Sequence, residues 1–447
     1  MLNLQYSRRD VLRSSVGLVG LTLPSFLQAK AKGSIAPKAK SCIVIYCWGG
    51  ISHYESWDPK PNAPVDLRGE FTPISTATPG VQFSEHIPLM AQHSDKMAIV
   101  RSVYHTDGGH GGALYTNMTG RKKAAGRAKD RKNWPSLMAM ISRHRPPAAG
   151  VPQAIRLPHS MYDNGSLIPG QFGGWLGPDY DPVVIPTPAG KPFGGVSRTS
   201  GRELNLKPTL QQSRMKQRQS LLELLDQAGA ARDEYDRLDK FQKMAADMLL
   251  DSAISRAYDL EQEDPRIRSM YGDHIGGQGM LLARRLTEVG VPVVQVCAGA
   301  GDLAGGNGDN WDTHRDHFPK MKKRLLPVFD RSVSALLVDL DQRGQLEETL
   351  VICLTDFGRT PKVNKNAGRD HYPAVYSVFL AGGGVQGGQV YGASDSSGQK
   401  PAENPCTPGD LHATVYQAMG INPRAELHDL EGRPFAICDG QPLPLFG

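Results

Sequence analysis

Three segments of the sequence concentrate the residue types that bind metal ions and move protons. Their letters are GGISHYESWDPKP at 49–61, NWDTHRDH at 310–317 and TDFGRT at 355–360, with GRDH a little further on at 368–371. Carboxylate oxygens and neutral imidazole nitrogens that converge from several loops hold zinc and the harder divalent ions. We therefore expect a divalent metal site, and the residue types leave open both the number of ions and their identity as zinc, calcium or magnesium.

The predicted metal ligands lie close together within these segments. Asp312 and His314 are one residue apart, so both side chains point to the same side of an extended chain. Asp356 directly follows an apolar run, where a strand end allows little motion. The predicted ligands are Asp312, His314, Asp356 and His371, with His53 or Asp58 in support. Taken singly, a loop Asp or His is more often a cap or a surface residue, and Asp370 could instead pair with Arg369.

A fourth cluster, HTDGGHGG at 105–112, places His110 between two pairs of glycines. The residues after His110 recur at helical spacing, which puts this histidine at a helix N-terminus, where backbone amides favour anions. The competing interpretation is a glycine-rich connector that contains a histidine by chance.

The elements that must position these residues form a repeated pattern of helix and buried strand. The runs 41–48, 291–297 and 349–354 are almost continuously apolar, as in strands buried on both faces of a parallel sheet. Helical spacing at 280–289 and 325–340 precedes the second and third runs. This order predicts an α/β fold with a mostly parallel central sheet between two helical layers. Such sheets bind ligands beyond the carboxyl ends of their strands.

Two further elements complete the predicted core, a strand at 376–380 and a terminal helix at 411–419. The stretch 121–262 is predicted to be an irregular and helical insertion, with helical spacing at 209–260. Seven basic residues against one acidic residue mark 121–132. This charge fits a solvated loop or, alternatively, a contact with a polyanion.

The chain has 447 residues, of which 39 % are hydrophobic, with 49 glycines and 33 prolines. This composition excludes a disordered, collagen-like or coiled-coil protein. Residues 1–32 have the order of an export signal, with Arg8-Arg9, an apolar run at 16–27 and a small-residue ending. Paired arginines indicate the twin-arginine route, and so a periplasmic or extracellular protein of residues 33–447. No segment of that mature chain has the sequence of a membrane span.

Charge and cysteine content narrow the class of partner. Five basic residues and one acidic residue in 1–32 supply +4 of the formal charge of +6. The mature chain is therefore nearly neutral, and we expect no nucleic-acid partner. The six cysteines lack the C-x-x-C spacing of zinc ribbons and redox motifs, and four lie in apolar runs that suit buried, unpaired side chains. Cysteine pairing and the oligomeric state stay open.

These segments resemble the bacterial family called domain of unknown function 1501. The matching residues are GGxSH and WDPKP at 49–61, LARRLTEVGV at 282–291, WDTH at 311–314, DFGRTP at 356–361, GRDH at 368–371 and DLHAT at 410–414. They occur in order over nearly the whole mature chain, behind a twin-arginine signal as in that family. The family is similar in turn to the alkaline phosphatase/sulfatase superfamily. That resemblance implies an alkaline-phosphatase-like three-layer sandwich with a metal site at the strand ends.

The resemblance to that superfamily also implies roles for single residues. Counting back from the TGR at 119–121 places His110 where sulfatases carry their nucleophile. The sequence has no C/S-x-P/A-x-R motif, so a formylglycine nucleophile cannot be made. The acidic pair that usually ends the first strand is Gly49-Gly50 here.

We therefore expect an exported metal-dependent hydrolase of phosphate or sulfate esters, acting on a small anionic ester or a sulfated or phosphorylated polymer. The metal would act as a Lewis acid, His110 as nucleophile or general acid, and Arg359 or Lys60 would hold the anionic oxygens. The alternative is an exported, non-catalytic protein of the same fold that binds carbohydrate, a sulfated polymer or a partner protein. The altered nucleophile position and the missing acidic pair favour it. A third possibility is that the Asp and His clusters only anchor loops.

Overall fold

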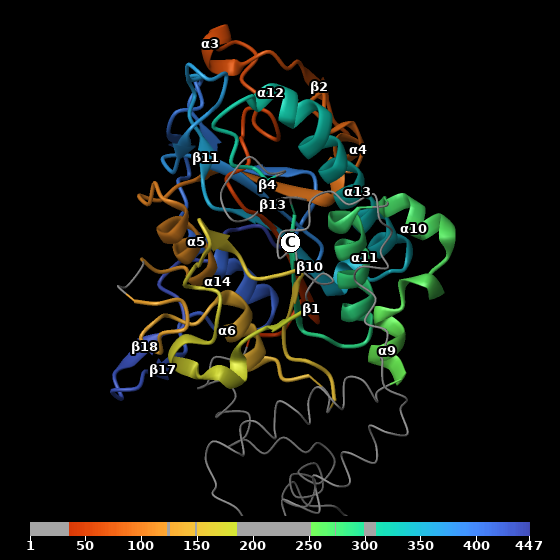
Figure 1. Cartoon of the computed structure of the whole chain (residues 1–447), viewed down its shortest axis with the longest axis vertical. Coiled ribbons are helices and arrows are strands. Elements are labelled where there is room, and N and C mark those ends of the chain that lie inside the picture. Colours follow the sequence, from red (N-terminus) through yellow and green to blue (C-terminus); the bar gives the residue numbers. More distant parts are fainter. Residues whose placement is uncertain (1–34, 123–125, 148–149, 186–251, 273, 299–309) are drawn as a thin grey trace, which may run out of the picture.

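An eight-stranded sheet in the order β14-β4-β13-β10-β1-β9-β5-β8 forms the centre of the protein in the computed structural model (Figure 1). The structure describes residues 35–122, 126–147, 150–185, 252–272, 274–298 and 310–447. The predicted export signal at 1–32 lies outside these residues, as does most of the helical segment predicted at 209–260.

Most neighbouring strands in this sheet are parallel, as the sequence predicts. β1 pairs in parallel with β10 and β9, β5 with β9 and β8, and β14 with β4, whereas β13 is antiparallel to both β10 and β4. The strands are β1 (Ser41–Cys47), β4 (Met97–Val103), β5 (Ile155–Leu157), β8 (Val183–Val184), β9 (Val293–Cys297), β10 (Thr349–Thr355), β13 (Tyr376–Ala381) and β14 (Gln389–Tyr391).

The central strand β1 shows why its sequence is continuously apolar. Ile43 and Ile45 pack into the core on one side of the sheet, whereas Val44 and Tyr46 pack into the core on the other side. Side chains alternate between the faces of a strand, so an unbroken apolar run needs both faces covered.

Helices cover both faces and complete a three-layer arrangement (Figure 1). One face carries α4 (Pro88–Gln92), α9 (Ser252–Tyr258), α10 (Pro265–Tyr271), α11 (Ile275–Glu288) and α13 (Leu326–Gln342). The other carries α5 (His110–Thr119), α6 (Leu137–His144) and α14 (Pro408–Ala418). Each helix among the described residues is too short or too polar to cross a membrane.

Short elements connect these layers. The two-stranded ribbons are β2 (Pro73–Ser75) with β3 (Gln82–Ser84), β6 (Tyr162–Asp163) with β7 (Ser166–Leu167), β11 (Gly358–Arg359) with β12 (His371–Tyr372), β15 (Ala393–Ser394) with β16 (Pro401–Glu403), and β17 (Glu426–His428) with β18 (Pro434–Ala436). The short helices are α3 (Val65–Arg68), α12 (His317–Lys320), the π-helical turn η6 (Met321–Leu325) and the 3₁₀ turns η1 (Ser94–Lys96), η2 (Gly174–Leu176), η3 (Pro178–Tyr180), η5 (Leu260–Gln262) and η7 (Leu346–Glu348).

The structure adds two features that the sequence pattern does not contain. The strand predicted at 376–380 is present but antiparallel, because no helix lies between β10 and β13 to carry the chain back for a parallel pairing. Part of the stretch 121–262, predicted as an insertion, belongs to the main fold, since α6 covers the sheet and β5 and β8 extend it. Strands of two and three residues are too short for a pattern to reveal. All six cysteines are buried and unpaired.

Candidate metal and ester site

The candidate site lies beyond the carboxyl ends of β9, β1 and β10, which are neighbours in the sheet. The parallel register sets Cys47 beside Thr355 and Tyr46 beside Cys297. The chain therefore leaves all three strands at one edge of the sheet, as expected for the binding side of an α/β fold. Residues 310–317 and 356–372 meet there with the N-terminus of α5.

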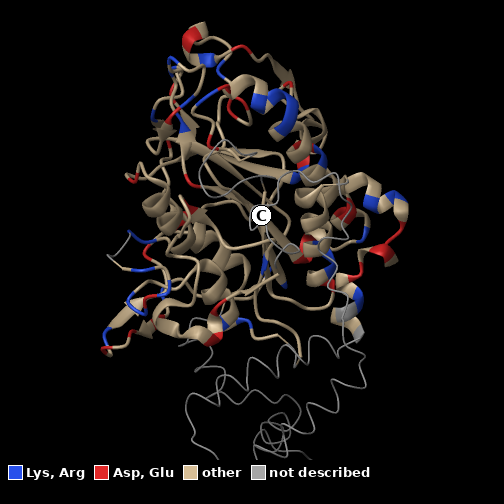
Figure 2. Cartoon of the chain, in the orientation of Figure 1, with Lys and Arg blue, Asp and Glu red and all other residues tan. Residues whose placement is uncertain are grey.

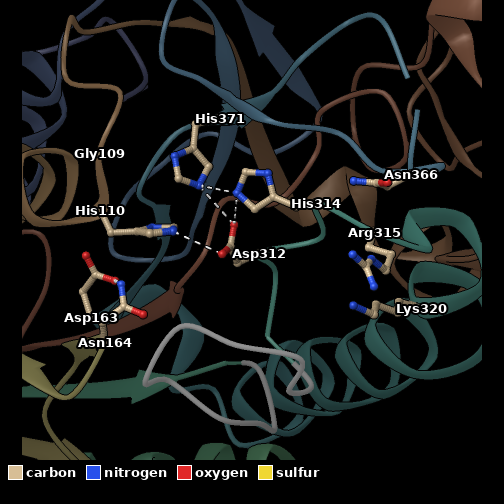
Figure 3. A pocket seen from close by; sticks show the side chains of 10 residues that line it. All are labelled: Gly109, His110, Asp163, Asn164, Asp312, His314, Arg315, Lys320, Asn366 and His371. Atoms are coloured by element: carbon tan, nitrogen blue, oxygen red, sulfur yellow. Dashed lines mark hydrogen bonds and ion pairs between the residues drawn. The ribbon is translucent and has the colours of Figure 1, made fainter. Parts of the chain in front are cut away.

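Three imidazoles surround the carboxylate of Asp312 (Figure 3). Its Oδ1 lies 3.0 Å from Nε2 of His314 and 3.1 Å from Nε2 of His371, and its Oδ2 lies 3.4 Å from Nε2 of His110. The Nε2 atoms of His314 and His371 are 2.9 Å apart. One donor atom each from His110, Asp312 and His371 lies within 4.8 Å of the others. This is a spacing at which several side chains can share one ion.

Each imidazole is held in place through its other ring nitrogen. The acceptors of Nδ1 are Asp356 Oδ2 for His110 at 2.7 Å, Asp370 Oδ1 for His314 at 2.6 Å and the Gly108 carbonyl for His371 at 2.7 Å. Carboxylate and carbonyl oxygens only accept, so each Nδ1 carries a proton and each Nε2 faces Asp312. Metal-binding histidines are typically oriented by such contacts.

Two features of this cluster would be satisfied by a bound cation. Nε2 of His110 is buried and has no hydrogen-bond partner among the described residues; at 3.4 Å from Asp312 it forms an ion pair only. Nε2 of His314 and Nε2 of His371 would point lone pairs at each other across 2.9 Å unless a proton or a metal ion lies between them. The residues present therefore fit a divalent ion bound by imidazoles and one carboxylate.

His110 is the first residue of α5, and its ring is fixed from behind. Trp48 stacks on it with 4.7 Å between the ring centroids. Asp356, which holds Nδ1, also accepts hydrogen bonds from the Tyr46 hydroxyl at 2.7 Å and the Gly49 N–H at 3.0 Å. The carboxylate of Asp356 is thus fully engaged behind His110 rather than facing the other imidazoles.

Arg359 is fully buried and directed at Asp312. Its Nη2 lies 2.7 Å from Asp312 Oδ1. The guanidinium also donates hydrogen bonds to the backbone carbonyls of Gly49, Gly50 and Arg369. Gly49 has a φ of 106°, and a Cβ there would lie 2.4 Å from the Asp312 nitrogen. Glycine is therefore required for the loop after β1 to approach the segment that carries Asp312.

Burial and charge act on the pKa values of this cluster in opposite directions. Burial would raise the pKa of Asp312, but the imidazoles and Arg359 hold it well below its usual range. Burial lowers the pKa of His110, yet the two neighbouring carboxylates outweigh this and raise it to about 9. The hydrogen bond to Asp312 raises the pKa of His314, whereas burial lowers that of His371. A metal ion entering the cluster would displace protons.

A cavity of about 550 Å³ opens in front of these imidazoles. The side chain of His110 is 6 % exposed and that of His314 is 43 % exposed, so the cluster meets solvent at its His314 end. The residues that line the cavity outside the cluster are Gly109, Asp163, Asn164, Arg315, Lys320 and Asn366. Sequence reasoning missed Arg315 and Lys320, although a basic residue directly after His314 was an available signal.

Three residues predicted for the site make their contacts elsewhere. Lys60 pairs with Asp58 at 2.8 Å, and Asp58 also accepts a hydrogen bond from Ser394. Nε2 of His53 lies 2.9 Å from the Gly398 carbonyl, and burial lowers the pKa of this histidine to about 4. The loop after β1 thus folds against β15 and the turn that follows it, which separates these side chains from the imidazole cluster.

Comparison with known proteins gives one family and several distant structures. The family model described as "Protein of unknown function (DUF1501)" matches residues 39–444, and no curated protein matches the sequence. One similar solved structure is a phosphonate monoester hydrolase from Silicibacter pomeroyi, at 12 % identity over 91 % of this chain and 76 % of that chain, with a TM-score of 0.41. A protein in the alkaline phosphatase superfamily from Vibrio parahaemolyticus has 9 % identity, coverage of 87 % and 68 %, and a TM-score of 0.38. A sulfatase from Pseudoalteromonas sp. has 12 % identity, coverage of 89 % and 70 %, and a TM-score of 0.35.

Proposed function

The chain belongs to the DUF1501 family, and from this premise we propose that it is an exported, metal-dependent hydrolase of phosphate or sulfate esters. One observation carries the proposal. His110, His314 and His371 are each held at Nδ1 by an acceptor, and each presents Nε2 to the carboxylate of Asp312. The substrate would be a small anionic ester or an ester group on a sulfated or phosphorylated polymer.

Asp312, His314 and His371 are the residues proposed to hold the metal. This donor set is rich in nitrogen, which suits zinc better than calcium or magnesium, because those ions prefer oxygen ligands. A bound zinc ion supplies Lewis acidity that offsets negative charge on the ester oxygens. Arg359 fixes the orientation of Asp312 from the buried side.

His110 is proposed to act on the ester as nucleophile or as general acid, and both roles use Nε2. As a nucleophile, Nε2 first gives its proton to solvent. It then forms a bond to phosphorus or sulfur while the alcohol oxygen leaves with its bonding electron pair, and water later cleaves the new bond. As a general acid, the imidazole gives a proton to the leaving oxygen. In both roles Asp356 keeps the proton on Nδ1, and Trp48 fixes the plane of the ring.

Replacing Asp312 with alanine tests the proposal. We expect Asp312→Ala to lose both its metal, measured by elemental analysis of protein purified without added metal, and hydrolysis of aryl phosphate and sulfate esters. Asp163→Asn is the matched control, because Asp163 lines the same cavity outside the cluster and its metal content should be unchanged. An unaltered metal stoichiometry in Asp312→Ala would refute the assignment.

One observation favours a non-catalytic protein of the same fold. Among the described residues, Asp312 is the carboxylate that the three Nε2 atoms share, since Asp356 is engaged by Tyr46, Gly49 and His110. A single shared carboxylate suffices to bind a metal and through it carbohydrate, a sulfated polymer or a partner protein. Protein that contains metal but does not turn over any of the aryl esters would support this alternative.

Export is proposed from residues 1–32, and it is tested without knowledge of the substrate. In a strain with twin-arginine transport, the Arg8→Lys, Arg9→Lys double variant should stay in the cytoplasm with its signal uncleaved. The control Arg13→Lys, outside the pair, should be exported like the wild type.

A further inference from the structure

The cavity has a second, cationic side next to the imidazole cluster. Arg315 and Lys320 line it together with the amide of Asn366, at the end of the cavity where His314 lies (Figure 3). Asp163 and Asn164 line the end near His110 in the same view. Figure 2 shows further Lys and Arg in the turn η6, which continues α12. In Figure 3 the cationic side of the cavity therefore lies next to His314 and not next to His110.

Among the described residues, neither cation on this side is paired with a carboxylate. Within the described residues, no Asp or Glu oxygen lies within 4.0 Å of the charged nitrogens of Arg315 or Lys320. The carboxylate of Asp312, which lines the same cavity, forms its ion pair with Arg359 at 2.7 Å. Charged groups that face a cavity without a counter-charge are the usual recognition groups for phosphate, sulfate and carboxylate.

Backbone hydrogen bonds hold the segment that follows Arg315 against the segment of Asn366. Residues 316–317 donate hydrogen bonds to the carbonyls of 366–367, at 3.2 and 2.9 Å. The segment of Arg315 and the segment of Asn366 are therefore fastened side by side. Since Arg315 and His314 line the same cavity, an anion bound by Arg315 in this cavity lies next to the imidazole cluster and not on a separate surface.

We propose that Arg315, Lys320 and Asn366 form a subsite for a second oxyanion of the same substrate molecule. The preferred substrate then carries a sulfate, phosphate or carboxylate group in addition to the one that binds at the imidazole cluster. This inference rests on the proposed function only in placing the first anionic group at the cluster. Esters that carry a second anionic group should then be hydrolysed faster than simple monoesters.

Two sulfonates serve as probes because they bind without being hydrolysed. Isothermal titration of the purified full chain compares benzenesulfonate with benzene-1,3-disulfonate. We expect the disulfonate to bind at least about tenfold tighter to the wild type, the effect of one additional charge-assisted contact. The Arg315→Gln, Lys320→Gln double variant should lower this preference to less than twofold and leave benzenesulfonate binding little changed. Lys323→Gln, a neighbouring exposed lysine outside the cavity lining, is the matched control and should keep the preference.

Equal affinities of the two probes for the wild type would overturn the inference. It would also be overturned if the double variant kept the preference for the disulfonate, or if Lys323→Gln lost that preference to the same extent. Metal content and aryl ester hydrolysis are measured on the same samples. If the wild type lacks both but prefers the disulfonate, the proposed function fails and the subsite stands. If the wild type hydrolyses esters without preferring the disulfonate, the subsite fails and the hydrolase stands.

Discussion

A buried triad of Glu55, Arg369 and His317 behind the site can be tested by stability measurements that need no substrate. Oε1 of Glu55 lies 2.7 Å from Nη2 of Arg369, and Oε2 lies 3.0 Å from Nε2 of His317. All three side chains are essentially inaccessible to solvent. Arg369 precedes Asp370, which holds His314, so the triad supports the imidazole cluster. Glu55→Gln keeps the shape of the side chain and leaves the buried guanidinium without its counter-charge.

The expected loss for Glu55→Gln is about 3 to 5 kcal/mol of unfolding free energy at pH 7, the usual cost of removing one partner of a buried pair. Burial opposes the charge on Glu55, but Arg369 and His317 outweigh it and lower its pKa from 4.5 to about 2. A shift of this size stabilises the folded chain by about 3 kcal/mol above pH 4.5. That contribution is lost as the pH falls toward 2, and about 1.5 kcal/mol of it is gone at pH 3.5. Glutamine does not titrate, so the gap between wild type and variant should shrink by this amount.

Urea unfolding followed by tryptophan fluorescence at pH 7 and at pH 3.5 measures both quantities. Glu70→Gln removes an exposed carboxylate from the same part of the chain and should change the unfolding free energy by less than about 0.5 kcal/mol. A cost for Glu55→Gln below about 1 kcal/mol would refute the reasoning, because the guanidinium would then have to be solvated. An equal gap at the two pH values would refute the assignment of the pKa shift.

Two further substitutions test how the cluster is held. In Asp356→Asn the amide can turn its NH₂ group toward Nδ1 of His110 and move the imidazole proton to Nε2. We therefore expect kcat/KM to fall by about 10- to 100-fold; ester kinetics measure this, and a change below threefold would contradict it. In Gly368→Ala the new Cβ would lie 1.9 Å from the carbonyl oxygen of His314, and the forced displacement should lower the unfolding free energy by about 2 kcal/mol or more. Gly108→Ala, whose Cβ would meet nothing within 4 Å, should cost far less, and equal losses for the two alanine variants would argue against a steric cause.

The sheet and the convergence of the main site residues could be predicted because both follow from short-range patterns. Unbroken apolar runs mark strands buried on two faces, and parallel strands end at one edge, which is why Asp312, His314 and His371 meet. His110 joins them because its glycine-rich segment leads into α5, the helix that packs beside β10. Patterns of this kind need no knowledge of long-range side-chain partners.

The residues that the sequence misplaces are those whose position depends on such partners. His53 and Asp58 have the same residue types as true cluster members and lie in a loop that also leaves β1. Their direction is set by contacts with Gly398 and Ser394, more than 300 positions away along the chain. The partner of Arg369 is Glu55 rather than its neighbour Asp370. Composition and spacing cannot distinguish Glu55 from Asp370 as the partner of Arg369, because either carboxylate would neutralise the guanidinium.

Gly49 lies where the loop after β1 leaves no room for an acidic side chain beside Asp312. The sequence lacks an acidic pair after β1, and this lack alone suggests a weakened metal site. The geometry gives a different reason, since a Cβ at Gly49 would lie 2.4 Å from the backbone nitrogen of Asp312, and the Gly49 N–H and carbonyl bind Asp356 and Arg359. An acidic residue at position 49 would push away the segment that carries Asp312. The glycine and the imidazole-rich cluster are thus two parts of one arrangement, in which the backbone after β1 closely approaches the segment of Asp312.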